Sequence, residues 1–479
     1  MSLKDLRAAL DSKQISAVEL AQKYLDKIDT DDKKINSYIT VCREGALNDA
    51  KAAQELIDSG NSGAFTGIPI SVKDNICTLG VKTTCASKML ENFVPIYDAT
   101  VIEKLKKDKF VMLGKTNMDE FAMGGSSQTS YFGGVKNPYD TDRVTGGSSG
   151  GAAASVAAGL CAAALGSDTG GSVRQPAAFC GVTGLKPTYG AVSRWGLIAF
   201  ASSLDQIGII ANSAFDTGYV LNGIYGYDCN DATSSKKSEG GYTSLVGSDI
   251  SKLKIGLPKE FFGDGIADDI KEAVLNAAEY YKSLGCQLVE CSLPSLEYAV
   301  SAYYLISSAE AASNLSRFDG IKYGYRSGLG EDFNDLIKNS RREGFGDEVK
   351  RRIMLGNYAL CSGYYDAYYK NATRIRTQIR QEYADIFEKC DVILTPTAPT
   401  TAYKIGQQEN DPVKMYLADI CTVTVNIAGL PAISTTCGYD KNNMPIGMSL
   451  IGKAFDEKTI IAVCDRFEHD FARKEADLK

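Results

Sequence analysis

A glycine-rich stretch in the first half of the chain constrains the fold more than any other feature. Between Gly114 and Gly208, 18 of the 95 residues are glycine, well above the usual glycine content of ~7%. Glycine adopts backbone conformations that are closed to other residues and lets the main chain approach a ligand closely. The stretch therefore predicts tight turns whose amide groups face a binding site.

Two glycine-serine runs and a preceding lysine mark this region as a candidate active site. The first run, Gly146–Gly151, contains Ser148, and the second run, Gly166–Ser172, ends in a serine. Lys73 follows a short apolar segment and lies 75 residues before Ser148, and Ser172 lies 24 residues after Ser148. The chain has one histidine in total, so a serine nucleophile here cannot be assumed to use histidine as its base.

These runs and their spacing from Lys73 resemble the amidase signature family, and the resemblance covers nearly the whole chain. It implies that Ser172 is the nucleophile, that Lys73 is the base, and that Ser148 lies between them after a cis peptide bond from Gly147. It also implies that residues 117–127 line the substrate pocket. A lysine that follows a strand is ordinarily a surface residue. The sequence spacing of Lys73 from both serines is what favours a catalytic lysine.

The chemistry of this site requires an uncharged lysine. Serine becomes a good nucleophile only when a base removes its proton, and lysine can be that base only in its neutral form. The reference pKa of lysine is ~10.4, and burial in a low-dielectric site lowers it by several units. We therefore expect Lys73 to be buried and substantially neutral. Ser148 would pass the proton from Ser172, because a hydroxyl both donates and accepts hydrogen bonds.

The backbone of the second glycine run is expected to stabilise the charge that develops on the substrate carbonyl. The N–H groups of Thr169, Gly170, Gly171 and Ser172 would form an oxyanion hole, in which one donor contributes ~3–4 kcal/mol in a comparable hydrolase. Asp168 is expected to hold this loop by hydrogen bonds and not to act as a base.

Alternating helical and strand patterns predict an α/β fold. We expect one large domain with a mixed, twisted sheet covered by helices on both faces, as the family resemblance also implies. Residues 1–60 would form a helical cover, residues 66–210 the catalytic core, and residues 211–479 the remaining sheet, helices and substrate pocket. A capping box at Ser16–Glu19 predicts the start of a helix. Further helices are expected at 46–59, 99–107, 149–159, 268–284, 298–317, 347–388 and 457–473, strands at 68–72, 110–113, 160–165, 252–256, 287–291, 391–397 and 445–451, and turns at 184–188 and 205–208.

Composition excludes several classes of function. The formal net charge of −7 argues against nucleic-acid binding by this chain alone, since the neutralisation of phosphates needs a basic surface. The 13 cysteines contain no C-x-x-C pair, and with one histidine they give no metal-ligand pattern. They are expected to be free thiols in a reducing cytoplasm. No signal peptide is expected at the N-terminus, and no apolar run approaches the ~20 residues that span a bilayer.

Three blocks in the second half carry a narrower resemblance. Residues 346–356, 363–369 and 416–423 are similar to the A subunits of the bacterial aminoacyl-tRNA amidotransferases. This resemblance implies hydrolysis of glutamine and delivery of the ammonia, within a complex with B and C subunits, to an acceptor on Glu-tRNA(Gln) or Asp-tRNA(Asn). It places ATP and Mg²⁺ on the partner, which also makes the main contacts to the charged tRNA, and implies no cofactor in this chain.

A pocket for free glutamine needs one fixed cation and one fixed anion, because the amino acid carries a carboxylate and an ammonium. By resemblance, Arg352 would bind the carboxylate, Asp419 the ammonium, and Tyr303 would lie nearby. The two parallel donors of a guanidinium suit a carboxylate. The alternative for Arg352 and Asp419 is a structural ion pair on a helix surface, and Tyr303 has an equally plain structural alternative.

Three other functions compete with this interpretation. A stand-alone amidase of the same family would act on small or fatty amides, although a fatty-amide enzyme would need an apolar entry that the sequence lacks. Gly146–Gly150 also satisfies G-x-S-x-G, the nucleophile elbow of α/β-hydrolases, with His469 in the right chain order. However, residues 139–143 before it do not resemble a strand. An inactive scaffold is disfavoured, because all three catalytic positions are intact.

Overall fold

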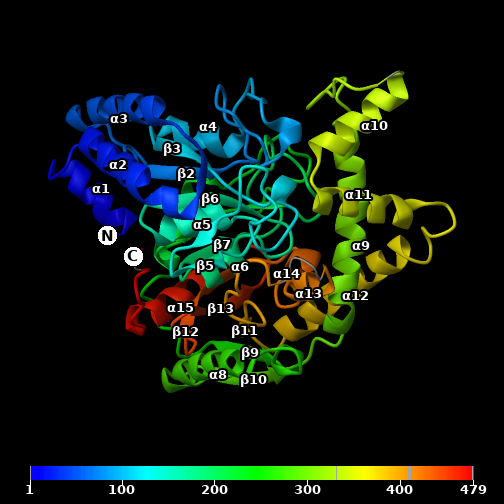
Figure 1. The fold of residues 1–479 in the computed structure, drawn as a ribbon. Helices are drawn as coiled ribbons and strands as arrows, with labels where there is room; N and C mark the ends of the chain where they lie inside the picture. The colour runs from blue at the N-terminus through cyan, green and yellow to red at the C-terminus, as the bar shows by residue number, and fades with distance from the viewer. Residues whose placement is uncertain (1, 331, 408–411, 477, 479) are drawn as a thin grey trace.

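The computed structural model describes residues 2–330, 332–407, 412–476 and 478. Its centre is an 11-stranded sheet with the order β1-β3-β2-β6-β8-β7-β12-β13-β11-β9-β10, and β4 pairs with β5 in a small second sheet. Helices cover both faces of the large sheet (Figure 1), so the predicted α/β architecture is confirmed. The division at residues 60, 66 and 210 stays a prediction.

The large sheet mixes parallel and antiparallel pairs. β2 is parallel to both β3 and β6, and β9 is parallel to β10 and β11. β8 runs antiparallel to β6 and β7, and β13 runs antiparallel to β11 and β12. The strands are β1 Tyr38–Val41, β2 Pro69–Lys73, β3 Val111–Thr116, β4 Lys136–Asn137, β5 Asp140–Val144, β6 Ala163–Asp168, β7 Thr183–Lys186, β8 Gln206–Ala211, β9 Lys254–Pro258, β10 Gln287–Cys291, β11 Val392–Pro396, β12 Ala432–Tyr439 and β13 Pro445–Gly452.

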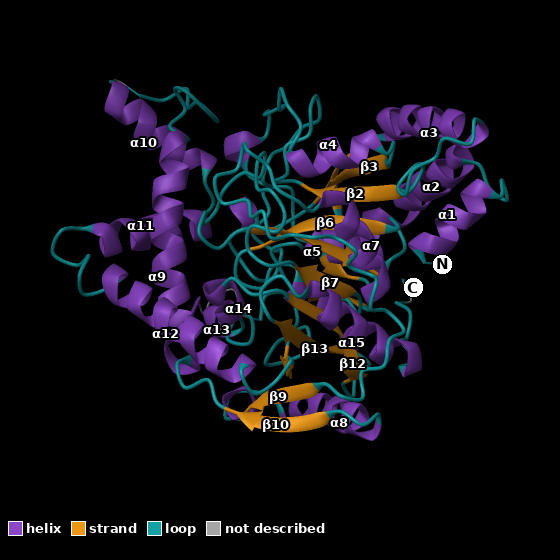
Figure 2. Ribbon diagram, turned by 180° about the vertical axis from the view of Figure 1, so that it is seen from behind, coloured by secondary structure: helices purple, strands orange, loops and turns teal. Residues whose placement is uncertain are grey.

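The helices form groups around this sheet. α1 to α3 gather near β2 and β3, whereas α9 to α12 stand together at the opposite side of the molecule (Figure 2). The predicted capping box is confirmed, because the Ser16 side chain accepts from Glu19 N and the Glu19 carboxylate accepts from Ser16 N. The helices are α1 Leu3–Asp11, α2 Ala17–Ile35, α3 Arg43–Asp58, α4 Thr100–Lys107, α5 Gly150–Ala157, α6 Arg174–Phe179, α7 Ala214–Ile224, α8 Asp268–Ser283, α9 Leu296–Asn314, α10 Phe333–Gly344, α11 Asp347–Leu360, α12 Tyr369–Phe387, α13 Pro412–Leu417, α14 Val423–Ala428 and α15 Glu457–Asp470.

Two neighbouring parallel strands bring the two halves of the candidate site together. β2 ends at Lys73 and β6 ends at Asp168, with Val72 opposite Leu165 in the register. Because parallel strands end at the same edge of a sheet, the lysine and the second glycine run start from adjacent points. The small residues of α5 let this helix lie close to neighbouring backbone. A Cβ on Gly151 would lie only 2.4 Å from Asn117 O.

Several predicted elements were wrong. The turns expected at 184–188 and 205–208 belong largely to the buried central strands β7 and β8, and β12 was not predicted. Glycine within these strands marks close backbone approach, since a Cβ on Gly208 would lie 2.6 Å from Leu185 O. The single helix expected over 347–388 is two helices, α11 and α12, separated by residues 361–368.

Candidate active site

Lys73 lies at the centre of a buried cluster of hydroxyl groups. Its side chain is fully buried. The Nζ atom lies 2.8 Å from Ser148 Oγ, 2.8 Å from Ser149 Oγ and 2.9 Å from Ser167 Oγ. Asn75 Nδ2 donates to Ser167 Oγ at 2.9 Å and so orients this hydroxyl. The predicted pairing of Lys73 with Ser148 is therefore present as a direct contact.

Burial changes the protonation of this lysine. Desolvation lowers the pKa of Lys73 to about 7, against the opposing attraction of the carboxylates of Asp119, Asp168 and Asp205. An amine with this pKa is neutral in a large fraction of molecules near pH 7, and a catalytic base works best when its pKa is close to the working pH. This pKa fits the role of base that the sequence predicts for Lys73.

The two glycine-serine runs are joined through their backbones. The Gly147–Ser148 peptide bond is cis, and Ser149 N donates to Ser172 O at 3.0 Å. The Ser172 side chain is 7% exposed, whereas Ser148 is completely buried. Within the described residues the Ser172 hydroxyl makes no hydrogen bond, so the contact from Lys73 to Ser148 is formed and the one from Ser148 to Ser172 is not. Of the two predicted catalytic serines, the predicted nucleophile is therefore the more exposed.

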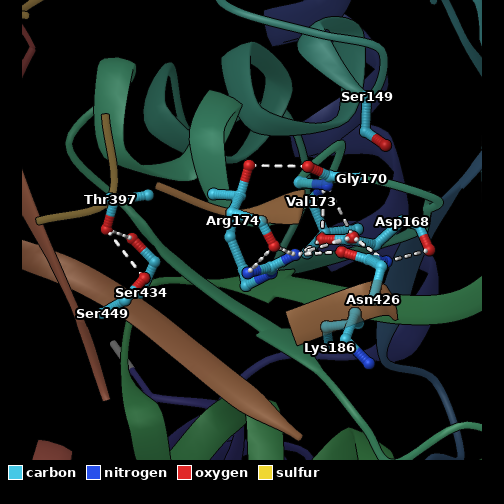
Figure 3. Close-up of polar contacts among 12 residues, drawn as sticks. Ser149, Asp168, Gly170, Val173, Arg174, Lys186, Thr397, Asn426, Ser434 and Ser449 are labelled. Carbon is cyan, nitrogen blue, oxygen red and sulfur yellow. Dashed lines mark hydrogen bonds and ion pairs between the residues drawn. The ribbon is translucent and has the colours of Figure 1, made fainter. Parts of the chain in front are cut away.

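The run Gly166–Ser172 ends in the predicted nucleophile and forms the nucleophile loop. Asp168 organises this loop through several hydrogen bonds (Figure 3). Its carboxylate accepts from Gly171 N at 2.9 Å, from Val173 N at 3.1 Å and from Asn426 Nδ2 at 2.9 Å, and it pairs with Arg174 at 3.0 Å. Although burial opposes ionisation, the buried Arg174 guanidinium holds the pKa of Asp168 well below its usual range. Asp168 is thus a permanent anion that shapes the loop, as the sequence predicted.

The amides of this loop have two different roles. Gly171 N donates to Asp168, so this amide is committed inside the loop and does not face a substrate in this structure. The amides of Thr169 and Gly170 have no acceptor among the described residues and remain available. The Gly170 carbonyl accepts from Thr422 Oγ1 at 2.6 Å, which anchors the loop against the segment that precedes α14.

The predicted substrate residues lie around the same loop. A Cβ on Gly170 would lie 2.5 Å from the Tyr303 hydroxyl, so this residue must be glycine and the ring lies directly on the loop. A Cβ on Gly125 would lie 3.9 Å from Asp419 Oδ1 and 3.9 Å from Gln175 Nε2. These contacts place Tyr303 beside the loop that ends at Ser172, and Asp419 beside residues 117–127.

Arg352 is buried, whereas Asp419 is half-buried. Arg352, on α11, is 2% exposed and pairs through Nε with Glu348 Oε1 at 2.6 Å. Desolvation raises the pKa of Asp419 to about 7, although a hydrogen bond from the Tyr304 hydroxyl opposes this rise. Arg352 thus does form an ion pair, but in the interior and not on a helix surface. Within the described part of the chain, its two Nη nitrogens have no hydrogen-bond partner.

Several residues of this region were missed by the sequence analysis. Glu348 lies one helical turn before Arg352, a spacing that could have suggested the ion pair. Tyr304 and Tyr416 pack against Arg352, and only their proximity to residues already singled out could have suggested them. Gln175 Oε1 accepts from Gly147 N at 3.0 Å, while its buried Nε2 has no partner in the described structure.

Two cavities lie near this part of the molecule. One of about 250 Å³ is lined by Ser126, Glu348 and Arg351 among others, and it adjoins the Arg352 pair. A larger groove of about 1000 Å³ lies between residues 88–97 and 314–326. The smaller cavity is the one that shares residues with the candidate site.

The described ranges contain neither a candidate metal site nor a candidate membrane span. There, no cluster of three or more His, Cys, Asp or Glu side chains could hold a metal ion. No helix in those ranges is long and apolar enough to cross a bilayer.

The competing nucleophile elbow has part of its expected local pattern. Residues 140–144 do form a strand, β5, contrary to the prediction, but β5 belongs to the small two-stranded sheet. Ser148 is buried against the Lys73 amine, and His469 is exposed on α15. The environment of Ser148 therefore supports a lysine-based site.

Comparison with known proteins now decides the family. The sequence model of the Amidase family matches residues 19–461. The chain belongs to this family. Relatives named as the A subunit of glutamyl-tRNA(Gln) amidotransferase include a protein from Ruminiclostridium cellulolyticum, 56% identical over 99% of this chain and 98% of that protein. Another, from Thermoanaerobacter pseudethanolicus, is 54% identical over 98% of this chain and 96% of that protein.

Solved structures of the family share the fold. The A subunit of glutamyl-tRNA(Gln) amidotransferase from Thermotoga maritima is 38% identical, with a TM-score of 0.82 over 100% of this chain and 98% of that chain. A peptide amidase bound to the inhibitor chymostatin is 27% identical, with a TM-score of 0.84 over 100% of this chain and 99% of that chain. The same fold thus occurs in a component of an amidotransferase and in an amidase named for peptide substrates.

Proposed function

We propose that this chain is the glutaminase component, the A subunit, of a tRNA-dependent amidotransferase. The observation that carries this proposal is the presence of a buried guanidinium, Arg352, and a half-buried carboxylate, Asp419, near a serine loop that lies beside a buried lysine. A guanidinium and a carboxylate match the two charged groups of a free amino acid. The two amidotransferase relatives, 54% and 56% identical over nearly their whole length, support the same function.

The proposed reaction begins with attack of Ser172 Oγ on the side-chain amide carbon of glutamine. The Ser172 proton moves to Ser148 Oγ as the Ser148 proton moves to the neutral Lys73 amine. The amides of Thr169 and Gly170, with that of Ser172, would stabilise the oxyanion, and Gly171 would act by holding the loop to Asp168. The C–N bond then breaks, and the proton returns through Ser148 to the departing ammonia.

The second half of the reaction releases glutamate. Water adds to the glutamyl ester on Ser172 and gives a proton to the relay, and the ester C–O bond breaks with return of the proton to Ser172 Oγ. No cofactor within this chain takes part in either half. Ammonia is the product that an amidotransferase uses.

The proposal also covers the partners of this chain. We propose a complex with B and C subunits, in which the partner binds ATP and Mg²⁺ and makes the main contacts to Glu-tRNA(Gln) or Asp-tRNA(Asn). The negative net charge of this chain, −7, fits a component that leaves tRNA binding to a partner. Because the proposed acceptor is a charged tRNA, we propose that the reaction takes place in the cytoplasm.

The test measures ammonia released from glutamine by the purified chain, alone and with its partner subunits and charged tRNA. We expect slow hydrolysis that rises when the partners are added. Ser172→Ala should abolish both hydrolysis and labelling by a fluorophosphonate probe, while the exposed-site control Ser248→Ala keeps both. Rapid hydrolysis of simple uncharged amides, with no response to partners, would instead support a stand-alone amidase.

A further inference from the structure

Two stacked tyrosines connect the two charged groups of the proposed glutamine pocket. The rings of Tyr304 and Tyr416 lie 3.9 Å apart and are inclined by 25°. The Arg352 guanidinium carbon lies 4.4 Å from the Tyr304 ring centre and 5.0 Å from that of Tyr416. A guanidinium at this range of aromatic faces is held by cation–π attraction, which is strongest away from water.

The two hydroxyl groups of the stack donate to two different carboxylates. Tyr304 donates to Asp419 Oδ2 at 2.6 Å. Tyr416 donates to Glu348 Oε1 at 3.1 Å, the same oxygen that accepts from Arg352 Nε at 2.6 Å. The anion, the aromatic stack, the second carboxylate and the guanidinium therefore form one continuous chain of contacts.

This chain of contacts joins three separate segments. Tyr304 comes from α9, Arg352 and Glu348 come from α11, and Tyr416 and Asp419 come from the segment at and after α13. Aromatic side chains have few rotamers, so a stacked pair holds its distance with little loss of conformational entropy. The separation of Arg352 from Asp419 is thus fixed by rigid groups from all three segments.

We propose that Tyr304 and Tyr416 are positioning residues that hold Arg352 and Asp419 at the spacing of an α-carboxylate and an α-ammonium. The inference rests on the proposed function and names its substrate class: ω-amides that carry both charges on one carbon. Tyr304 serves the ammonium end through Asp419. Tyr416 serves the carboxylate end through Glu348 and Arg352.

The Tyr304 hydroxyl also affects when Asp419 is charged. Its hydrogen bond favours the ionised carboxylate, in opposition to burial, which raises the pKa of Asp419 to about 7. Removal of the hydroxyl should raise this pKa further, so that fewer molecules hold an anion at neutral pH. The charged or titratable groups that face Asp419 are Tyr303 and Tyr304 from α9, Arg352 from α11, Asp168 from the end of β6, and Asp119.

The experiment compares Tyr304→Phe and Tyr416→Phe, which keep both rings, with the exposed control Tyr298→Phe on the same helix. Initial rates are measured with glutamine, with glutaramate, which lacks the amine, and with 4-aminobutanamide, which lacks the carboxylate. Loss of a hydrogen bond to a charged group supports an increase on the order of 10-fold in KM. We expect this increase for Tyr304→Phe with glutamine and not with glutaramate, with a smaller change in kcat. At higher pH, where Asp419 ionises again, the increase should shrink.

Tyr416→Phe should show the complementary pattern, with a KM increase for glutamine and glutaramate and none for 4-aminobutanamide. Tyr298→Phe should match the wild type. An equal loss on all three amides, or no change in either variant, overturns the positioning roles while leaving the wild-type glutaminase intact. A wild type that releases no ammonia from glutamine would instead refute the proposed function, and this inference with it.

Discussion

The two sides of the candidate site are built from different structural elements and different types of residue. The catalytic side, from Lys73 to Ser172, consists of strand ends, glycine turns and small hydroxyl side chains packed at the edge of the sheet. The substrate side consists of aromatic rings and long charged side chains on α9, α11 and the segment near α13. One side is shaped by backbone, and the other by side chains from distant segments.

This difference separates the tasks of the two sides. Proton transfer needs short, fixed distances, which neighbouring parallel strands supply because their ends are set by sheet hydrogen bonds. Recognition of a substrate needs a shape that can vary between relatives. Helices outside the sheet can supply it without disturbing the catalytic groups. The Thermotoga maritima protein and the peptide amidase share the whole fold, at TM-scores of 0.82 and 0.84.

The largest expected effect comes from removing the proposed general base, Lys73, from the catalytic side. Lys73→Met keeps the length of the side chain but removes the amine, and general base catalysis contributes ~10²–10⁴-fold, so we expect kcat/KM to fall by that range. In the wild type, kcat at saturating glutamine should rise through pH about 7 as Lys73 becomes neutral, because burial lowers its pKa to about 7. Rates of ammonia release between pH 5.5 and 8.5 measure both effects.

A second buried lysine provides the matched control for this prediction. Burial also lowers the pKa of Lys186 to about 7, but its Nζ donates to Pro187 O at 2.8 Å and not to the serines. Lys186→Met should leave the midpoint of the pH profile in place. If the rise near pH 7 persists in Lys73→Met, or moves in Lys186→Met, Lys73 is not the base.

The next largest effect is expected from a substitution that alters the substrate side and leaves the catalytic side unchanged. Asp419→Asn keeps the shape of the side chain but removes the anion, and we expect KM for glutamine to rise about 10- to 100-fold, since an unpaired ammonium loses a charged hydrogen bond. Labelling of Ser172 by a small fluorophosphonate should be unchanged, because the probe carries no ammonium. Steady-state kinetics and the labelling rate are the measurements. Equal losses in both would mean that Asp419 supports the catalytic loop itself.

The same division explains how far the sequence could predict the molecule. The sequence predicted the contact between Lys73 and Ser148, because the residues of this side lie in short runs beside glycine or a strand end, whereas the catalytic roles of Lys73, Ser148 and Ser172 stay predictions. Gly171 was placed among the oxyanion donors, but its amide donates to Asp168, a detail that depends on the turn of the loop and not on the residue type. Likewise, glycine in β7 and β8 suggested turns where it marks close strand packing.

The substrate side was readable only by resemblance. Arg352, Asp419 and Tyr303 were named because neighbouring blocks resemble the amidotransferase A subunits. Nothing local in the sequence indicates that α9 and α11 would bring them together. Tyr304 and Tyr416 lie 112 residues apart and were not predicted, because their contact depends on packing between helices that hydrophobic periodicity alone cannot orient.

The smallest expected effect lies where the two sides meet. Thr422 Oγ1 donates to Gly170 O at 2.6 Å, and a Cβ on Gly171 would lie 2.3 Å from the same hydroxyl, so Thr422 couples the nucleophile loop to the segment that carries Asp419. Thr422→Val keeps the shape but removes the donor, at a cost of about 1 kcal/mol. If the contact only stabilises the fold, Tm falls and kinetics do not change. If it also aligns the loop with the pocket, kcat for glutamine should fall about 2- to 5-fold while KM stays constant, and we expect this second outcome.

Thr377→Val, at an exposed threonine on α12 that donates to the backbone at 3.1 Å, is the control for loss of a hydroxyl alone. A rise in KM without a fall in kcat would show that the contact serves the substrate side alone.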